Sequence, residues 1–289
     1  MDKFKLVTDT ASDLPRAYLE EHDIDVLSLA YIIDGATYNW EHPMDDHVFY
    51  DKMRAGAMPT TSQVNMEDAK SYFERLIAGQ DEILCLAFSS GLSGTYNSIA
   101  VAAKEICEEH PGKKIRVVDT KAASLGQGLM VDWARRMRNE GKSVDETADF
   151  MEQHYNQFAH VFTVDDLNHL HRGGRVSKAT AVIGTLANIK PLLHVDDEGH
   201  LINVDKVRGR RKSLLALVDM MEKKMGDHLA DNKTIFISHG DCPEDAQFVA
   251  DEVKRRFGIT DFLIHYVGPT IGAHTGPGVV ALFFYGEER

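Results

Sequence analysis

The chain is poor in the residues that build disulfide frameworks and cysteine-based metal sites. Its 289 residues include three cysteines, Cys85, Cys107 and Cys242, which are widely spaced and form no CxxC pair. An odd number of distant cysteines is typical neither of a disulfide framework nor of a zinc site. There is no HExxH motif, and His169 and His171 have no third ligand at a recognisable spacing. The sequence therefore predicts no bound metal.

Long apolar runs and a basic surplus are also missing. No stretch of about 18 uncharged apolar residues predicts a transmembrane helix, and the first residues lack the apolar segment of a signal peptide. The 45 acidic residues outnumber the 32 basic ones, which gives a net charge of −13. Because binding to phosphates needs clustered Lys and Arg, we expect neither a nucleic-acid nor a membrane partner. We expect a cytoplasmic globular protein.

The apolar pattern predicts an α/β protein with two domains, residues 1–160 and 161–289. In the first, strand-like runs alternate with helical spacing, which indicates a mostly parallel sheet with helices on both faces. In the second, two strands flank Asp-Asp-Glu-Gly as in a hairpin, and helices follow, which indicates an α+β domain. No Pro-rich linker separates the domains, so we expect a cleft between closely joined units.

The same pattern gives bounds for the individual elements. The expected strands are residues 4–8, 26–33, 82–88, 114–119, 160–164, 189–195, 201–207, 234–239, 262–267 and 279–285. The expected helices are residues 15–22, 45–55, 65–78, 95–109, 125–140, 144–158, 213–228 and 243–257. Residues 26–33 are apolar at nearly every position, as in a strand buried on both sides.

Four segments rich in Gly, Ser and Thr follow strands or precede helices: residues 8–15, 59–63, 89–95 and 268–278. Ligands of open α/β sheets gather at the carboxyl ends of strands, where free backbone N–H groups favour an anion. Structural roles compete with ligand binding. Asp13 reads more readily as a helix cap, whereas Thr60 and Ser62 fit turn and cap roles as well as they fit ligand binding. His274 lies in a glycine-rich loop, where packing explains an imidazole less well.

Known catalytic and phosphate-binding motifs do not fit these segments. Residues 90–94, Ser-Gly-Leu-Ser-Gly, match neither GxxxxGK[ST] nor GxGxxG. They also fail the GxSxG pattern, because Gly94 directly follows Ser93. An acyl hydrolase with a Ser93–His274 dyad remains open, although no orienting acid can be named. A binding module for a small anion or a phosphorylated metabolite remains open as well.

Two basic stretches, residues 171–178 and 206–212, stand out in the acidic chain. Each is either a solvated charged face or a surface that docks an acidic or phosphate-bearing partner. Neither contains aromatic residues, which makes nucleic acid a weaker candidate.

Together and in this order, the segments resemble the DegV family of bacterial fatty-acid-binding proteins. The pieces that carry the resemblance are residues 8–15, 59–63, 89–96, 170–177, 188–193 and 272–278. The resemblance implies a two-domain α/β protein that buries one long-chain fatty acid in an apolar pocket. It implies neither catalysis nor a cofactor. A separate ATP-dependent fatty acid kinase would phosphorylate the presented carboxylate to an acyl phosphate, which feeds phospholipid synthesis.

The resemblance also assigns residues. The carboxylate ligands would be Thr61, Ser93 and His274, followed by Ser62, Gly94 and Thr95. The residues facing the partner kinase would be Arg172, Arg175 and Arg208. Ser and Thr hydroxyls suit a carboxyl group in either protonation state, because they donate and accept hydrogen bonds. Residues 38–46 depart from the usual family pattern.

Overall fold

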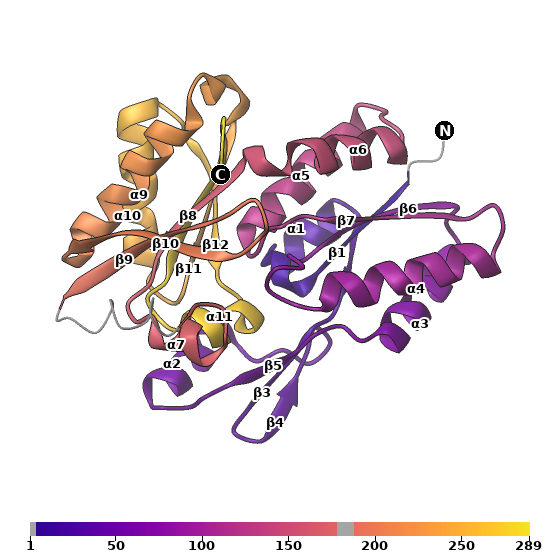
Figure 1. Ribbon diagram of the computed structural model, residues 1–289, viewed down its shortest axis with the longest axis horizontal. Helices are drawn as coiled ribbons and strands as arrows, with labels where there is room; N and C mark the ends of the chain where they lie inside the picture. Colours follow the sequence, from indigo (N-terminus) through magenta and orange to yellow (C-terminus); the bar gives the residue numbers. More distant parts are fainter. Residues whose placement is uncertain (1–3, 178–187) are drawn as a thin grey trace.

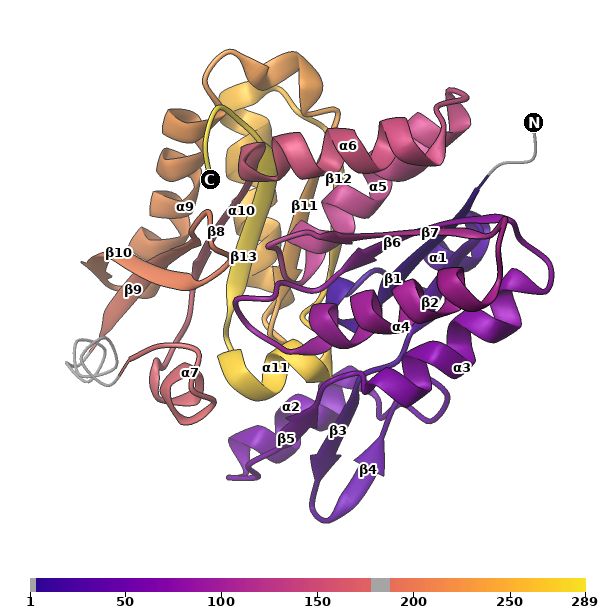
Figure 2. The ribbon, with the colours of Figure 1, turned by 45° about the vertical axis from the view of Figure 1, so that its right-hand side comes forward.

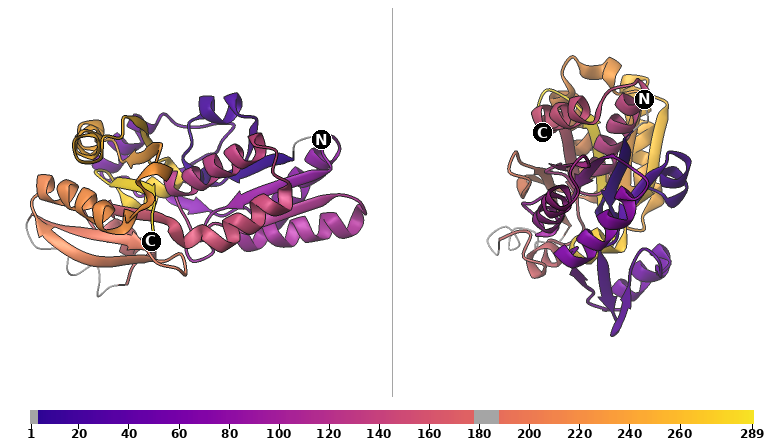
Figure 3. Two further views of the ribbon diagram at one scale, coloured as in Figure 1. Left: turned by 90° about the horizontal axis from the view of Figure 1, so that it is seen from above. Right: turned by 90° about the vertical axis from the view of Figure 1, so that its right-hand side faces the viewer.

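The computed structural model describes residues 4–177 and 188–289, which form two lobes side by side (Figures 1 and 3). The first lobe holds a four-stranded sheet in the order β2-β1-β6-β7 and a small sheet in the order β4-β3-β5. The second lobe holds a six-stranded sheet in the order β10-β9-β8-β13-β11-β12. The predicted α/β fold with two domains is confirmed.

The four-stranded sheet is parallel throughout, as predicted. Its strands are β1 (Lys5–Asp9), β2 (Ile24–Leu27), β6 (Glu82–Ala87) and β7 (Lys114–Asp119). Alternate side chains of β6 enter two different cores, so both faces are covered. Leu84 and Leu86 share a core with α5 (Leu125–Asn139) and α6 (Val144–His154). Ile83 and Cys85 share the other with α3 (Met66–Ile77) and α4 (Thr95–Glu109).

The single strand predicted over residues 26–33 is wrong. β2 ends at Leu27, and β3 (Ala30–Ile33) pairs instead with β4 (Ala36–Tyr38) and β5 (Thr60–Ser62) in the small sheet. At the break, side-chain hydroxyls rather than a neighbouring strand accept the hydrogen bonds of backbone N–H groups. The Leu29 N–H donates to Thr10 Oγ1 and the Trp40 N–H to Ser28 Oγ, both at 2.9 Å. Both strands contribute buried side chains, so the apolar run looks continuous.

The second lobe begins at Phe158, inside the helix expected over residues 144–158. That helix ends at His154, and a 3₁₀ turn (Tyr155–Gln157) leads into β8. The expected domain boundary at residue 160 falls within β8 and stays a prediction. The strands of this lobe are β8 (Phe158–Thr163), β9 (Ile189–Val195), β10 (Leu201–Arg208), β11 (Thr234–His239), β12 (Asp261–Tyr266) and β13 (Val280–Tyr285).

One face of this mixed sheet packs against α9 (Arg210–Met225) and α10 (Pro243–Phe257) in a separate core. The predicted β9–β10 hairpin is present, and its turn uses Gly199 at a φ of +82°. The tip of the hairpin reaches the first lobe, where Ser89 Oγ donates to the Gly199 carbonyl at 3.0 Å. A Cβ at Gly91 would lie 2.7 Å from the Glu198 carbonyl oxygen, so the glycine permits this close contact.

Two further expectations about local structure are wrong. The glycine-rich segment 268–278 contains a helix, α11 (Pro269–Thr275), which Pro269 begins and Gly276 ends at a φ of +76°. His274 is therefore held on a helix. Asp13 does not cap α1 (Arg16–Glu21), whose first turn has no side-chain cap. Asp13 adopts a left-handed conformation, and its Oδ2 accepts a bond from Ser124 Oγ at 2.5 Å.

The remaining helices are short. They are α2 (Asp46–Arg54) between β4 and β5, α7 (Asn168–Arg172) after β8, and 3₁₀ turns at Thr10–Ser12 and His228–Asp231. Figure 2 shows α2 and the small sheet below α11. In residues 4–177 and 188–289, no helix is both long and apolar enough to cross a membrane.

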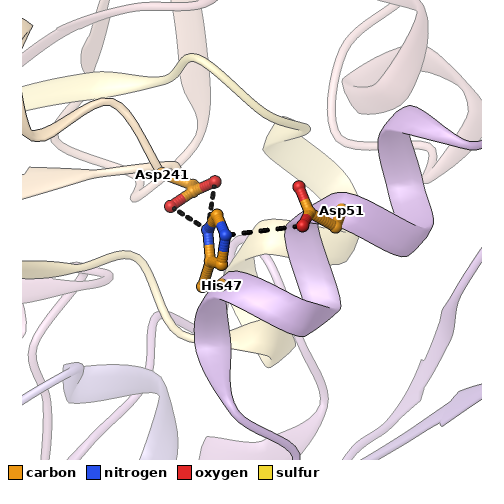
Figure 4. Close-up of side chains that lie close together, drawn as sticks. All are labelled: His47, Asp51 and Asp241. Carbon is orange, nitrogen blue, oxygen red and sulfur yellow. Dashed lines mark hydrogen bonds and ion pairs between the residues drawn. The ribbon is translucent and has the colours of Figure 1, made fainter.

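An ion-pair cluster ties α2 to the turn after β11 (Figure 4). His47 Nδ1 lies 3.0 Å from Asp241 Oδ1, and His47 Nε2 lies 3.4 Å from Asp51 Oδ2. Their ligand atoms lie close enough for a metal ion, but Arg54 donates to the Asp241 carboxylate and carbonyl and already supplies positive charge. Burial opposes ionisation of Asp241, whereas hydrogen bonds from Arg54 and His47 bring its pKa below the ordinary value.

We predict that Asp241→Asn lowers the free energy of unfolding by about 1 kcal/mol, because it removes the charge that pairs with Arg54 and His47. Asn tolerates the left-handed conformation of this residue, whose φ is 56°. The hydrogen bond to Asp241 raises the pKa of His47, so its share of the stability is complete below about pH 6.5. That share is lost as the pH rises through the raised value.

Urea unfolding at pH 6 and pH 8 measures both effects, with exposed Glu74→Gln on α3, outside the cluster, as the control. A variant as stable as the wild type at pH 6 would contradict the assignment.

Candidate functional site

A cavity of about 540 Å³ lies between the inner face of the six-stranded sheet and the loops of the first lobe. Its size falls within the range of small-molecule sites. The residues that line it are Leu29, Thr61, Ser62, Gln63, Asn65, Phe88, Leu92, Ser93, Gly94, Ala123, Ser124, His160, Phe162, Leu170, Arg175, Val195, Leu201, Ser238, Val267, Thr270, Ile271, His274, Thr275, Val279, Ala281 and Phe283.

The cavity wall is mostly apolar and comes from both lobes. Phe162 of β8, Phe283 of β13 and Val195 of β9 project from the inner face of the second sheet and are buried. Leu29 and Phe88 close the cavity from the first lobe. These side chains remove hydrocarbon from water and offer a polar head group no partner, so only the polar lining residues can bind one.

Polar groups gather where the cavity meets the surface. Thr61 is half-buried, while Ser62, Gln63 and Asn65 are exposed, so this end of the cavity is open to solvent. Thr61 of β5 pairs with the buried Tyr31 of β3, and its Oγ1 lies 2.9 Å from Nε2 of His274. That contact joins the small sheet to α11.

His274 is held in one orientation by its neighbours. A Cβ at Gly173, just after α7, would lie 2.2 Å from His274 Nδ1, so only glycine lets the imidazole pack there. Within the described residues, His274 Nδ1 has no hydrogen-bond partner, and the ring acts through Nε2. Burial, helped by the charges of Arg175 and Arg172, lowers the pKa of His274 to about 4. The ring is therefore neutral at pH 7.

Ser93 reaches the same polar end from the loop before α4. Its Oγ accepts from the Thr95 N–H at 3.2 Å and lies 2.9 Å from Thr95 Oγ1. With Thr95 Oγ1 as the donor, Ser93 keeps its own proton for a ligand. The Thr95 side chain is fully buried and outside the cavity wall, where its Oγ1 also accepts the Val64 N–H at 3.3 Å. Thr95 thus orients Ser93 from behind.

Ser62 and Gly94 both line the cavity. A Cβ at Gly94 would lie 2.3 Å from Oε1 of Gln63, so the glycine makes room for that amide.

The three arginines expected to face a partner differ in their placement. Arg175 lines the cavity, and its guanidinium donates to the Leu92 carbonyl at 3.0 and 3.1 Å and to the Gly173 carbonyl. It joins α7 to the loop that carries Ser93, so its guanidinium is engaged by backbone carbonyls, and its role toward a partner kinase stays a prediction. Arg172 is exposed on α7, with Nη2 2.9 Å from Nδ1 of His169.

Arg208 is exposed at the end of β10. Its register partner, Ile189, shares a face of β9 with the cavity-lining Val195, because residues of a strand alternate between faces. Arg208 therefore lies on the cavity side of the sheet. Lys178, in the first basic stretch, lies outside the described residues.

Several lining residues were not predicted from the sequence. Gln63 lies within the segment 59–63 and Asn65 lies two residues beyond it, whereas Ser124 and Ser238 belong to no motif named above. Ser124 Oγ lies 3.0 Å from Ser238 Oγ and joins the two lobes. His160 lies in a strand that reads as core, and burial lowers its pKa well below the ordinary value. No signal in the sequence distinguishes it from a packing residue.

The acyl hydrolase alternative requires Ser93 to contact His274. The hydroxyl that bonds His274 is that of Thr61, and Ser93 bonds Thr95. No described hydrogen bond forms the proposed dyad.

Comparisons with known proteins match this chain over almost its whole length. The model of the DegV family, an uncharacterised protein family, matches residues 3–287. A DegV domain-containing protein of Clostridium perfringens is 45% identical and covers 100% of this chain and 99% of its own.

Solved structures agree with the fold. A fatty acid binding DegV family protein from Thermus thermophilus is 32% identical, with a TM-score of 0.86 over 98% of this chain and 99% of its own. A fatty acid binding DegV family protein from Streptococcus agalactiae is 31% identical, with a TM-score of 0.84 over 99% of both chains. Fatty acid binding is thus described for solved DegV family proteins similar to this one.

We predict that Gly173→Ala displaces the imidazole of His274 and breaks its contact with Thr61. The added methyl group overlaps the ring, and such overpacking costs about 1–3 kcal/mol. Thermal unfolding measures the loss, and a crystal structure of the variant shows the ring position. Gly79→Ala is the control, because nothing lies within 4 Å of a Cβ there. An unmoved ring would contradict the prediction.

We also predict that His274 lowers stability in mild acid. Its folded pKa of about 4 lies below the unfolded value of about 6.5, so the unfolded state binds the extra proton between them. Stability is complete above pH 6.5 and falls as the pH drops toward 4, by at most about 1.4 kcal/mol per pH unit.

Urea unfolding from pH 7 to pH 5 should show a shallower fall for His274→Gln than for the wild type, with exposed His110→Gln as the control. Titration of the ring protons by NMR gives the pKa directly. A His274 ring that titrates near pH 6.5 would contradict the assignment.

Proposed function

Because the chain belongs to the DegV family, we propose that it binds one long-chain fatty acid in the cavity between its lobes. The observation that carries this proposal is a cavity whose wall is mostly apolar and which has a cluster of polar groups at an end open to solvent. An acyl chain fits the apolar wall and a carboxylate the polar cluster. A small anion or phosphorylated metabolite would leave the apolar wall without a partner.

Burial of the chain supplies most of the affinity. About fourteen methylenes contribute on the order of 11 kcal/mol at roughly 0.8 kcal/mol each. Ordering of the chain and desolvation of the carboxylate subtract from that sum. The head group therefore needs satisfied hydrogen bonds more than it needs a strong ionic clamp.

The carboxylate is held by neutral donors. Thr61 Oγ1 and Ser93 Oγ donate to it, and the neutral imidazole of His274 fixes the Thr61 hydroxyl through Nε2. Ser62 and the backbone around Gly94 complete the ring of polar groups, while Thr95 orients Ser93. Arg175 adds a positive field, but its guanidinium hydrogen bonds stay with backbone carbonyls.

The protein presents this carboxylate to a separate ATP-dependent fatty acid kinase and performs no catalysis itself. The open polar end leaves the carboxylate accessible to a second protein. Exposed Arg172 and Arg208 form the docking surface, since positive groups steer an acidic or nucleotide-bearing partner. The acyl phosphate product enters phospholipid synthesis in the cytoplasm of a bacterial cell.

We predict that Ser93→Ala weakens fatty acid binding about tenfold, because it removes one hydrogen bond to a charged group. Fluorescence titration of delipidated protein with a long-chain fatty acid measures the effect. Ser71→Ala on the exposed face of α3 is the control and should bind as the wild type does. Unchanged affinity in Ser93→Ala would contradict the head-group assignment, and stabilisation by phosphates alone would favour the small-anion alternative.

We predict that the double variant Arg172→Ala and Arg208→Ala keeps its fatty acid but slows phosphorylation by the kinase at least tenfold. The loss should shrink at high salt, because exposed charges act through a screened field. Transfer of labelled phosphate from ATP by a bacterial fatty acid kinase measures the rate. Arg255→Ala on α10 is the matched control. Wild-type rates in the double variant would rule out this docking surface.

A further inference from the structure

The wall of the lipid cavity carries a second group of hydroxyls besides those of Thr61 and Ser93. Ser124 just before α5, Ser238 of β11 and Thr270 of α11 all line the cavity, and none is more than 7% exposed. A plain acyl chain forms no hydrogen bond with any of them. Hydroxyls in the wall of a site for hydrocarbon therefore call for an explanation.

The hydroxyl of Thr270 is without a partner. Thr270 shares a face of α11 with His274, because residues four apart in a helix lie on the same side. The Thr275 hydroxyl of the same helix donates to the Ile271 carbonyl at 3.3 Å, whereas that of Thr270 forms no hydrogen bond to any described part of the chain. The residue four before it, Tyr266, lies in β12 and offers no helical carbonyl. A buried polar group without a partner is rare and indicates a missing ligand or water.

The serine pair offers an acceptor near the start of α11. Ser124 Oγ donates to Asp13 Oδ2 at 2.5 Å and lies 3.0 Å from Ser238 Oγ, which donates to it in turn. A hydroxyl oxygen accepts two hydrogen bonds, so one lone pair of Ser124 stays unused. Gly268, two residues before Thr270, packs against Asp13, since a Cβ at the glycine would lie 2.7 Å from Asp13 Oδ1. This packing brings the start of α11 beside the serine pair.

We propose that the cavity selects a fatty acid with a hydroxyl group on its chain, which accepts from Thr270 and donates to Ser124. The inference rests on the proposed fatty acid site and names the class of acid that fills it best. Thr270 precedes His274 by one turn, about 6 Å along the axis of α11, so the hydroxyl belongs in the half of the chain nearer the carboxyl group. A keto group accepts from Thr270 but has no proton for Ser124.

Competition binding to the delipidated full chain tests the proposal. The probes are hexadecanoic acid and its 3-hydroxy, 5-hydroxy, 7-hydroxy and 16-hydroxy derivatives. We expect at least one of the first three derivatives to bind at least tenfold more tightly than hexadecanoic acid, because two net hydrogen bonds are gained. The 16-hydroxy derivative places its hydroxyl at the wrong end of the chain and should gain nothing.

The outcomes separate this inference from the proposed function. If hexadecanoic acid binds and none of the first three derivatives binds more tightly, the inference is wrong and the fatty acid site stands. That result is also the one expected if an ordered water satisfies Thr270. If no acid binds, the proposed function fails and the inference fails with it.

Variants locate the selection at Thr270. Thr270→Val keeps the shape of the side chain but removes its hydroxyl, and it should abolish the preference for the hydroxy acid. Thr270→Ser keeps a hydroxyl and should keep the preference. Thr275→Val is the matched control, because it removes a hydroxyl of the same helix that already has a partner, and it should keep the preference as well.

A full preference in Thr270→Val would overturn the assignment. Each preference is the ratio of two affinities on one protein, so it holds even if a variant is less stable.

Discussion

The contact between Thr61 Oγ1 and His274 Nε2 joins segments 213 residues apart and fixes the polar end of the cavity. This contact depends on three local features in separate segments of the chain. The apolar run breaks at Ser28, so the small sheet can present β5; Gly173 gives the imidazole room; and α11 begins at a proline and ends at a glycine. Loss of any of these moves the hydroxyl away from the ring.

The hydrogen-bonding groups at the polar end of the cavity are neutral because of the residues around them. A buried imidazole beside two arginines resists protonation, and the half-buried guanidinium of Arg175 donates its hydrogen bonds to backbone carbonyls. The cavity therefore keeps a hydrogen-bonding end without a charged clamp, although the chain as a whole carries a net charge of −13. Under the proposed function, such an end would hold a carboxylate by neutral hydrogen bonds and leave its oxygens open to a partner.

The sequence was sufficient for the elements with strong periodicity. The parallel sheet, its helices and the β9–β10 hairpin follow from alternating and helical apolar patterns, and the structure confirms them. The pattern failed where two burial environments look alike, as at residues 26–33, and where a helix is short and glycine-rich, as in α11. Turn residues such as Asp13 form tertiary contacts that no local rule predicts.

The residues of the candidate site were harder to predict from the sequence than the fold was. The resemblance to DegV proteins, not residue spacing, suggested Thr61, Ser93 and His274, because the side chains that meet in the cavity come from distant segments. His160 and Ser238 lie in strands that read as core, and the buried role of Arg175 depends on a carbonyl 83 residues away. Tertiary packing determines which side of each strand faces the cavity.

The most direct measurement is a crystal structure of the protein as purified, without added lipid. The account predicts electron density for one acyl chain along the apolar wall between the lobes, with its carboxylate within hydrogen-bond distance of Thr61 Oγ1 and Ser93 Oγ. A cavity that holds only ordered water, or an acyl chain with its carboxylate at the buried end beside Ser238, would contradict it.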